Sequence, residues 1–463
     1  ASDVYKRQMV RNVSVTYKNT YAMSISGFRP EIGDMLGQTK GASGFAPGLD
    51  FAFGMTGDSY INKALDNGWL VSDSVVSPAT TNAQEDLQIR MTLEPVRDLK
   101  IDLNAGRTRN KSNQIQFMYE GMPQIQSGNF NMTVITIGSA FERRSASNGY
   151  SSSSFNRFLG NLDIIKNRIE NMYAGVPYQG QSGLNQQPLY QVNKYSSDVM
   201  IPAFLAAYTG RSASNSALDL FPGILSMMPN WRVTYSGLSK LEFFKKYFKS
   251  VTLNHAYRST YSVGSYSTFQ NFHSYMGDWG FVDDIQTGIP VPSSMYDVSA
   301  VSINEQFSPL LGVDVTFKNG ITTKVEYKTT RILNLSLAAN QIVESSTKDF
   351  VLGMGYKIMG LELFPGRNKK DSKNKISNDL ALRMDVSFRN QSALARDIQQ
   401  VTTQATSGNK ALKISFSADY TLSRLLSVSF YYDRQKNTPL VSASSYPVTS
   451  ADFGMRLKFS LTR

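Results

Sequence analysis

The chain has 463 residues and a net charge of +12, with 18% charged and 11% aromatic side chains. This charged fraction is below the roughly 25% of soluble globular proteins, and no run of about 18 apolar residues exists to form a transmembrane helix. Cysteine is absent, which excludes disulfides and thiolate metal sites. The composition fits strands with one face toward lipid and the other toward water, and equally a Ser- and Tyr-rich extracellular β-protein.

The positive charge accompanies no RNA-binding signature, helix-turn-helix or zinc-finger spacing. The basic residues are spread over predicted strands and turns, so we interpret the charge as solvation of a polar face and of loops. Nucleic acid is not expected as a partner, and lipopolysaccharide is a lesser alternative.

The first segment, Ala1–Gln8, breaks the pattern that begins at Met9, and we interpret it as non-native sequence. No signal peptide opens the chain. If the protein is exported, we expect that this start is not the native one.

Residues 9–150 are predicted to form strands of a β-barrel, because apolar and polar residues alternate with a period of two. The first two strands read as a hairpin-like pair. The predicted strands are Val13–Tyr17, Tyr21–Ile25, Leu87–Leu93, Leu99–Ala105 and Phe130–Ala140.

Residues 151–229 interrupt this pattern and are predicted to be a helical or loop insertion. Phe155–Tyr173 has apolar residues at helical spacing, and Ala203–Tyr208 and Ala217–Met228 are shorter apolar runs. Because the backbone of a barrel wall must pair strand to strand, these helices are expected in a plug, a cap or a periplasmic insertion. For the first helix, packing is favoured over a gating role.

Residues 230–463 are predicted to return to barrel strands, which brings the expected total to about 16. The segments are Trp231–Tyr235, Val251–Tyr257, Val298–Phe307, Val313–Lys318, Ile321–Leu337, Phe350–Ile358, Leu380–Phe388, Leu412–Leu422, Leu426–Tyr432 and Asp452–Thr462. The longer of these segments have about the 9–11 residues of a tilted membrane-crossing strand, or somewhat more.

The last strands alternate most clearly, and their parity divides the side chains into two sets. The set expected to face lipid is Leu412, Ile414, Phe416, Phe453, Leu457, Phe459 and Leu461. The set expected to face the lumen is Arg383, Asp385, Arg389, Lys413, Asp419, Arg456 and Lys458. The polar set is interpreted as a hydrated lumen with mixed charges or as plain solvation of a polar face.

The predicted connections fit a barrel whose short turns lie in the periplasm. Asn319-Gly320 is a strong hairpin signal, and 423–425 is a second short turn. Long loops are expected over 338–349, 390–410 and 433–451 on the opposite side. The link over 359–378 is an exception, because it predicts a long periplasmic connection; its basic run, Lys369–Lys375, is interpreted as a solvated loop or a contact with a periplasmic partner.

Arg331 falls among apolar residues by parity, in a predicted strand that exceeds one membrane crossing. Two interpretations stay open. Either the strand extends past the bilayer and Arg331 lies at the interface, or a β-bulge resets the parity.

Candidate catalytic and metal-binding residues are few. His255 and His273 are the only histidines, and neither has metal-ligand spacing. Asp278, Asp283 and Asp284 are candidate oxygen ligands for a hard cation, although a solvated loop fits them better. With no nucleophile and base in evidence, the sequence predicts no enzyme, no metal and no cofactor.

Several long stretches of the chain resemble the SprA/Sov family, the outer-membrane translocon of the type IX secretion system in Bacteroidetes. The stretches are Asn12–Gly37, Pro229–Leu241, Val251–Tyr266, Asp314–Leu337 and Ser346–Ile358. The resemblance covers nearly the whole chain after Gln8 and implies a C-terminal fragment of the translocon.

The expected fold class is therefore all-β: a transmembrane antiparallel β-barrel, as part of a very large barrel, with short helical insertions. The resemblance implies a protein-conducting channel in the outer membrane of a Gram-negative cell, with a lateral opening and a link to gliding motility in some relatives. It implies as partners cargo proteins with C-terminal secretion signals and proteins that gate or plug the barrel; outer-membrane lipid is a further expected partner. The alternatives are a nutrient-uptake barrel of the TonB-dependent type and a soluble surface β-sandwich or adhesin. One departure is the C-terminus, where many outer-membrane barrels end in an aromatic residue and this chain ends Phe459-Ser-Leu-Thr-Arg463.

Overall fold

The computed structural model describes most of the chain. The described residues are 9–31, 33–41, 44–57, 59–71, 77–117, 124–176, 190–284, 288–361, 379–422, 426–441 and 446–459. Within them, no helix is both long enough and apolar enough to cross a membrane.

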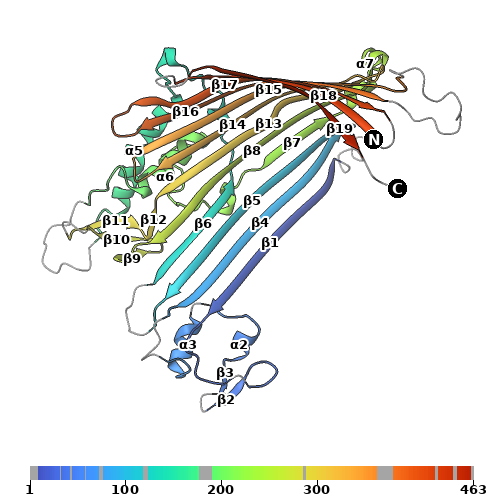
Figure 1. Ribbon diagram of the computed structural model, residues 1–463. Helices are drawn as coiled ribbons and strands as arrows, with labels where there is room; N and C mark the ends of the chain where they lie inside the picture. The colour runs from blue at the N-terminus through green and yellow to red at the C-terminus, as the bar shows by residue number, and fades with distance from the viewer. Residues whose placement is uncertain are drawn as a thin grey trace.

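One antiparallel sheet of 14 strands dominates the structure (Figure 1). Its main path runs β1-β4-β5-β6-β8-β13-β14-β15-β16-β17-β18-β19, so nearly every strand pairs with its neighbour in the sequence. The bounds are β1 (Val10–Ser24), β4 (Ala79–Val96), β5 (Leu99–Ile115), β6 (Ile125–Thr133), β7 (Asn230–Tyr235), β8 (Phe248–Thr268), β12 (Tyr296–Val298), β13 (Ala300–Phe317), β14 (Thr322–Ser336), β15 (Gln341–Ile358), β16 (Leu380–Asp397), β17 (Thr403–Thr421), β18 (Leu426–Pro439) and β19 (Val448–Phe459). The expectation of antiparallel strands with short helical insertions is confirmed.

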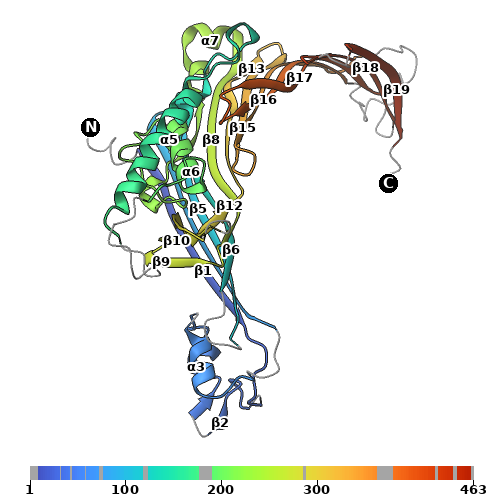
Figure 2. The same ribbon diagram turned by 90° about the vertical axis from the view of Figure 1, so that its left-hand side faces the viewer.

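The sheet is open in the described part of the chain. There, β1 pairs with β4 and β19 pairs with β18, and neither edge strand pairs with the other. The sheet bends, and in Figure 2 strands β16 to β19 turn away from the side on which helices α5 and α6 lie. These residues therefore form a curved wall rather than a closed barrel.

One row of this wall is a strand in two halves. β6 pairs with β5 from Arg107 to Gln114, and β7 continues along the same strand from Leu99 to Asn104. Both halves pair with β8 on their other side. The chain thus leaves the wall after Thr133 and returns to the same row at Asn230, and residues 134–229 are an insertion into a single strand.

The insertion is mainly helical and packs against one face of the sheet. It contains α4 (Ile137–Ala140), η1 (Ala146–Asn148), α5 (Ser153–Met172), α6 (Ser197–Thr209) and η2 (Ile224–Ser226). α5 presents a buried stripe that includes Phe158, Leu162, Ile165 and Ile169, as its periodicity predicts. The sheet contributes buried residues from several strands to the same core, among them Phe130, Met132, Tyr261, Val263, Tyr296, Val298, Val301, Ile303, Leu333, Leu335 and Ile342.

Two smaller units complete the fold. Between β1 and β4, β2 (Thr39–Gly41), β3 (Gly44–Ala46), α2 (Leu49–Ala52) and α3 (Tyr60–Asp66) surround a separate core around Ile61 and Trp69. A three-stranded sheet, β9 (Phe272–Met276), β10 (Trp279–Asp283) and β11 (Pro290–Ser294), packs on the insertion. The first unit extends from the sheet at the end opposite α7 (Glu242–Tyr247), as Figure 1 shows.

Several predicted boundaries are wrong. The predicted hairpin at the start is one strand, β1. The insertion begins after Thr133 rather than at residue 151, and the segment predicted as strand over 130–140 ends as α4. The apolar run 217–228 contains only the 3-10 turn η2. The stretch 9–150 also holds the unit around α2 and α3, because short apolar runs do not distinguish a strand from a buried helix.

The three predicted long loops are mostly strand. β15 begins at Gln341, β16 continues to Asp397, and β18 continues to Pro439. In these outer halves the apolar–polar alternation fades, although the backbone ladder continues to the strand ends. Periodicity therefore underestimates the length of strands that extend past an apolar surface.

Candidate functional surfaces

An apolar band crosses the whole sheet on one face. In β16 and β17 the register pairs Phe388 with Leu412, Val386 with Ile414 and Met384 with Phe416. The same face continues to both edges through residues that the register links strand by strand. These are Phe350, Leu352 and Met354 in β15, Val325 and Tyr327 in β14, Leu311 and Val313 in β13, Leu253 in β8, Trp231 and Val233 in β7, Ile101 and Leu103 in β5, Ile89 and Met91 in β4, Val13 and Val15 in β1, and Phe430, Tyr432, Phe453 and Met455 in β18 and β19.

The residues predicted to face lipid belong to this band. Leu412 and Phe416 are exposed, and Phe453, Leu457 and Phe459 are 80%, 65% and 60% exposed. Ile414 lies between its neighbours on the same face. Leu461 lies outside the described residues. Large apolar side chains at such exposure form one continuous surface, which marks a site of interaction with lipid or with other protein.

The residues predicted to face the lumen all lie on the opposite face. Arg383 is paired with Ser417, and Asp385 with Ser415. The register also links Asp419 through Ser429 to Arg456. Arg389, Lys413 and Lys458 share that face by the same register.

Ion pairs give this polar face a mixed charge. Arg389 makes two contacts with Asp349, of 2.7 and 3.2 Å. Lys357 lies 2.6 Å from Asp379, and Glu326 contacts both Lys324 and Lys328. The face therefore carries charges of both signs, some of them paired, rather than a field of one sign.

Short turns and an aromatic cluster mark one end of the band. Gly320 adopts a positive φ of 87° in the predicted Asn319-Gly320 turn, which is confirmed. The link 423–425 lies outside the described residues. α7 lies beside the turn at Lys318, to which Tyr247 is hydrogen-bonded, and its rings form a cluster with those of neighbouring strands. The cluster contains Phe243, Phe244, Tyr247, Phe248 and Phe317.

The helical insertion covers the same face as the apolar band, at the opposite end. β14 has an unbroken register with β15, so Val325, Tyr327, Arg331, Leu333 and Leu335 all point to one side. The first two belong to the band, and the last three are buried under the insertion. The insertion therefore does not cover the polar face, and of the three expected placements (plug, cap or periplasmic insertion) a plug against that face does not fit.

This geometry decides between the two interpretations of Arg331. No bulge interrupts β14 at that position, and the strand extends past the apolar band. Arg331 is 4% exposed and makes a 2.7 Å ion pair with Glu305 of the neighbouring strand. It also donates to the backbone carbonyl of Ser139 in α4, at 2.6 Å, and to the Ser139 hydroxyl. The arginine therefore holds the first helix of the insertion on the wall.

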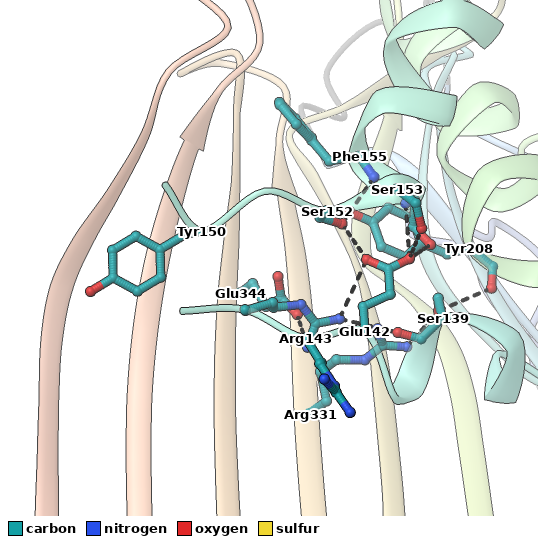
Figure 3. Close-up of polar contacts among 12 residues, drawn as sticks. Ser139, Glu142, Arg143, Tyr150, Ser152, Ser153, Phe155, Tyr208, Arg331 and Glu344 are labelled. Atoms are coloured by element: carbon teal, nitrogen blue, oxygen red, sulfur yellow. Dashed lines mark hydrogen bonds and ion pairs between the residues drawn. The ribbon is translucent and has the colours of Figure 1, made fainter. Parts of the chain in front are cut away.

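Arg331 is one of six charged residues between the insertion and the wall, three acidic and three basic. Figure 3 shows three of them, Glu142, Arg331 and Glu344. Glu344 contacts both Arg144 of the insertion, at 2.9 Å, and Arg396 of β16, at 3.0 Å. The Arg396 guanidinium also donates to the Tyr150 carbonyl. The six are Glu142, Arg144, Glu305, Arg331, Glu344 and Arg396.

Sequence reasoning found only one of these six. Glu305, Arg331, Glu344 and Arg396 share one feature, namely a charge at a position whose parity places it on the apolar face. A charge there is costly unless it is paired. Four such positions on adjacent strands are a signal that something covers the sheet.

Glu142 organises the start of α5, and Figure 3 shows it facing a cluster of serines. Its carboxylate accepts hydrogen bonds from the hydroxyls of Ser152 and Ser153 and from the Ser154 amide, at 2.6, 2.7 and 2.9 Å. Ser152 in turn accepts from the Phe155 amide, which is a standard N-cap contact. Burial raises the pKa of Glu142, but these hydrogen bonds outweigh it and hold the pKa below its usual value.

Asp198 of α6 holds the three-stranded sheet against the insertion. It is 2% exposed and accepts from the Ser293 hydroxyl and the Ser294 amide, both at 3.0 Å. Burial raises the pKa of Asp198, and the hydrogen bonds from Ser294 and Ser293 only partly offset it. Burial therefore favours the protonated form of the carboxyl, against the hydrogen bonds that favour its charged form.

The candidate metal ligands do not come together. Asp278 accepts from the Tyr296 hydroxyl, whereas Asp283 contacts His273 at 3.2 Å. His255 lies within β8 and its Nδ1 is 2.6 Å from the Leu310 carbonyl. Among the described residues no group of three potential ligands is close enough to hold a metal ion. The basic run 369–375 lies outside the described residues.

Comparison with known proteins yields structural similarity alone. No protein-family model matches the chain, and no curated protein is similar to it. Among solved structures, the chain is similar to OmpT, an outer membrane protein of Vibrio cholerae, at 9% identity and a TM-score of 0.21. A loop L8 deletion mutant of OmpT matches at 7% identity and a TM-score of 0.21. Each match covers 83% of this chain and 93% of the other.

One expectation is corrected by this comparison. The sequence predicted that the chain is not an enzyme, and we withdraw that exclusion beside structures named OmpT, because a similarity at this level excludes no reaction. A TM-score of 0.21 assigns no reaction to the chain either.

Proposed function

We propose that this chain is part of the wall of an outer-membrane β-barrel, and that the wall lines a conduit for secreted proteins. The observation that carries the proposal is the apolar band, which runs in register from β1 to β19 opposite a polar face. In β16 and β17 the band spans nine residues, Leu380–Phe388 and Leu412–Tyr420. At about 3.3 Å per residue and a tilt of roughly 40°, nine residues cross about 23 Å, close to the ~25 Å apolar height of outer-membrane barrels.

Features at the two ends of the apolar band indicate which end of the wall faces the periplasm. Short turns favour the periplasmic side of outer-membrane barrels, which places Asn319-Gly320 and α7 in the periplasm. The exposed rings of Phe243 and Tyr247 lie beside Lys245 and Lys246, and this combination suits a membrane–water interface. The insertion then lies on the cell exterior, on the outward side of the wall and above the outer leaflet.

Unpaired sheet edges favour a larger assembly. β1 and β19 are 15 and 12 residues long and have one partner each in the described part of the chain. Unpaired backbone groups are not tolerated in hydrocarbon. We propose that further strands, from the same or another chain, continue the wall at both edges, and a wall of many strands encloses a wide aqueous channel.

The protein-conducting role depends on the resemblance of long stretches of the chain to the type IX secretion translocon. The polar face suits that role, because its paired charges present no field that would retain cargo of one sign. Cargo with C-terminal secretion signals and gating proteins are the proposed partners. A soluble β-sandwich fits less well, since it requires a second sheet over the band, and no described strand covers Phe416 or Phe430.

Deletion of the full-length gene tests the conduit. We expect secreted proteins with the C-terminal signal to accumulate folded in the periplasm, while the levels of unrelated outer-membrane proteins stay unchanged. Complementation with the intact gene serves as the control. Continued export of these proteins to the cell surface would remove the secretion role, whereas loss of nutrient uptake alone would favour the TonB-dependent alternative.

A further inference from the structure

Four basic side chains form a row on the apolar face, at the end of the band nearer the insertion. They are Lys348, Lys410, Arg434 and Lys436. Lys348 and Lys410 are both paired with Asn390, and Lys436 and Arg434 lie opposite Leu412 and Ile414. With strands about 4.8 Å apart and two residues spanning about 6.6 Å, neighbouring cations are roughly 7–10 Å apart. We call these four residues the basic rim.

The basic rim carries unbalanced charge. All four side chains are exposed. Their register partners on the same face are neutral, namely Thr329, Asn390, Leu412, Ile414, Thr438, Thr449 and Ala451. On the polar face of the same strands, Arg389 and Lys357 pair with carboxylates. The basic rim has only neutral register partners, so its charge is available to an anion from outside the chain.

Apolar side chains lie directly beside the basic rim, two residues further along each strand toward the apolar band. Phe350, Phe388 and Leu412 lie two residues from Lys348, Asn390 and Lys410, on the side of the band, and are 43%, 45% and 38% exposed. A ligand that satisfies both surfaces has an anionic head and apolar tails. A long Lys or Arg side chain places its charge at the headgroup level while its stem covers apolar surface.

We propose that the basic rim binds the phosphate groups of a lipid headgroup in the leaflet that surrounds the wall. The inference rests on the proposed function, because it requires the apolar band to face lipid and the rim to lie at its outer edge. A row of cations, each within about 10 Å of the next, suits a headgroup with more than one phosphate, or a row of adjacent headgroups. Each Lys or Arg near an anionic membrane surface adds to the attraction.

The test measures binding of lipid A, a glycolipid with two phosphates, to the folded full chain in neutral detergent. Lipid A stripped of its phosphates is the matched ligand. We expect the unaltered protein to prefer the phosphorylated form at least tenfold, equivalent to about 1.4 kcal/mol. The variant carries Lys348→Gln, Lys410→Gln, Arg434→Gln and Lys436→Gln and should lose that preference. The control carries Arg383→Gln, Lys413→Gln, Arg456→Gln and Lys458→Gln on the polar face and should keep it.

The other outcomes are equally informative. Equal preference in the rim variant and the unaltered protein would overturn the inference. Displacement of lipid A by inorganic phosphate at equal concentration would also overturn it, since the site would then bind a free anion. If the rim variant fails to fold, the unaltered protein decides, because its preference must fall as sodium chloride rises from 0.05 to 0.5 M. None of these results depends on cargo export, so failure here and failure of the conduit are distinguishable.

Discussion

The buried pair of Glu305 and Arg331 gives the sharpest prediction about how the insertion is held. Both side chains are at most 4% exposed, and their closest atoms are 2.7 Å apart. Arg331→Met leaves the Glu305 carboxylate buried without its cation, and such a loss costs about 3–5 kcal/mol. Glu305 keeps its hydrogen bonds from Thr136 and Tyr257 in this variant. We therefore expect a loss of unfolding free energy at the lower end of that range, about 3 kcal/mol.

The assay is equilibrium unfolding by guanidinium in detergent, followed by tryptophan fluorescence. Trp231 stacks on Tyr257 with ring centroids 4.4 Å apart, so this region contributes to the signal of the three tryptophans. Hydrogen exchange in α4 gives a second measurement. We expect the α4 amides to lose protection in the Arg331→Met variant, because Arg331 donates two hydrogen bonds to Ser139.

An exposed ion pair on the opposite face provides the control. Arg389 contacts Asp349 at a comparable 2.7 Å, but its side chain is 60% exposed. Arg389→Met should therefore cost about 0–1 kcal/mol. The double variant Glu305→Gln, Arg331→Met should recover most of the lost free energy, since it removes the stranded charge. Equal costs for Arg331→Met and Arg389→Met would refute the reasoning.

Three further predictions follow from the faces and from the pKa values. Phe416→Lys should lower the free energy of unfolding in lipid vesicles by about 2–4 kcal/mol, and Lys413→Phe, on the polar face, should be milder; tolerance of the new lysine contradicts the wall assignment. The pKa of Asp198 is raised in the folded chain, so its stabilisation of the fold is present in acid and is lost as pH rises through that raised pKa. Asp198→Asn should remove this pH dependence from hydrogen exchange in α6. An unchanged pH profile in the variant would count against the role of Asp198. The pKa of Glu142 is lowered in the folded chain. Its stabilisation of the fold is therefore present above the ordinary pKa and is lost as pH falls through the lowered pKa. Glu142→Gln should cost about 1 kcal/mol near neutral pH, and fraying of α5 measured by hydrogen exchange should show it; an unaffected helix start argues against the cap.

Local patterns predicted the parts of the chain in which one surface is apolar. The alternation in 380–388 and 412–422 identified two strands, and their parity placed Phe416 and Lys413 on opposite faces. The helical spacing of 155–173 identified α5. These predictions succeed because side-chain direction follows directly from backbone geometry over a few residues.

Long-range pairing explains what the sequence missed. Nothing in the local pattern indicates that β6 and β7 share one row, because their union depends on pairing with β5 and β8. The ion pairs of Glu344 also depend on long-range pairing. Glu344 of β15 contacts Arg144 of the insertion and Arg396 of β16, which lie far from each other in the sequence.

The sequence by itself therefore determined the class of fold and the two faces of the wall. It did so because apolar and polar residues alternate with the pleat wherever the outward face is apolar. Tertiary structure alone decided where Arg331 lies and what covers it. The role of a charged residue on an apolar face can be inferred only once its partner is known. The partner of Arg331 in the insertion, Ser139, lies far from it in the sequence.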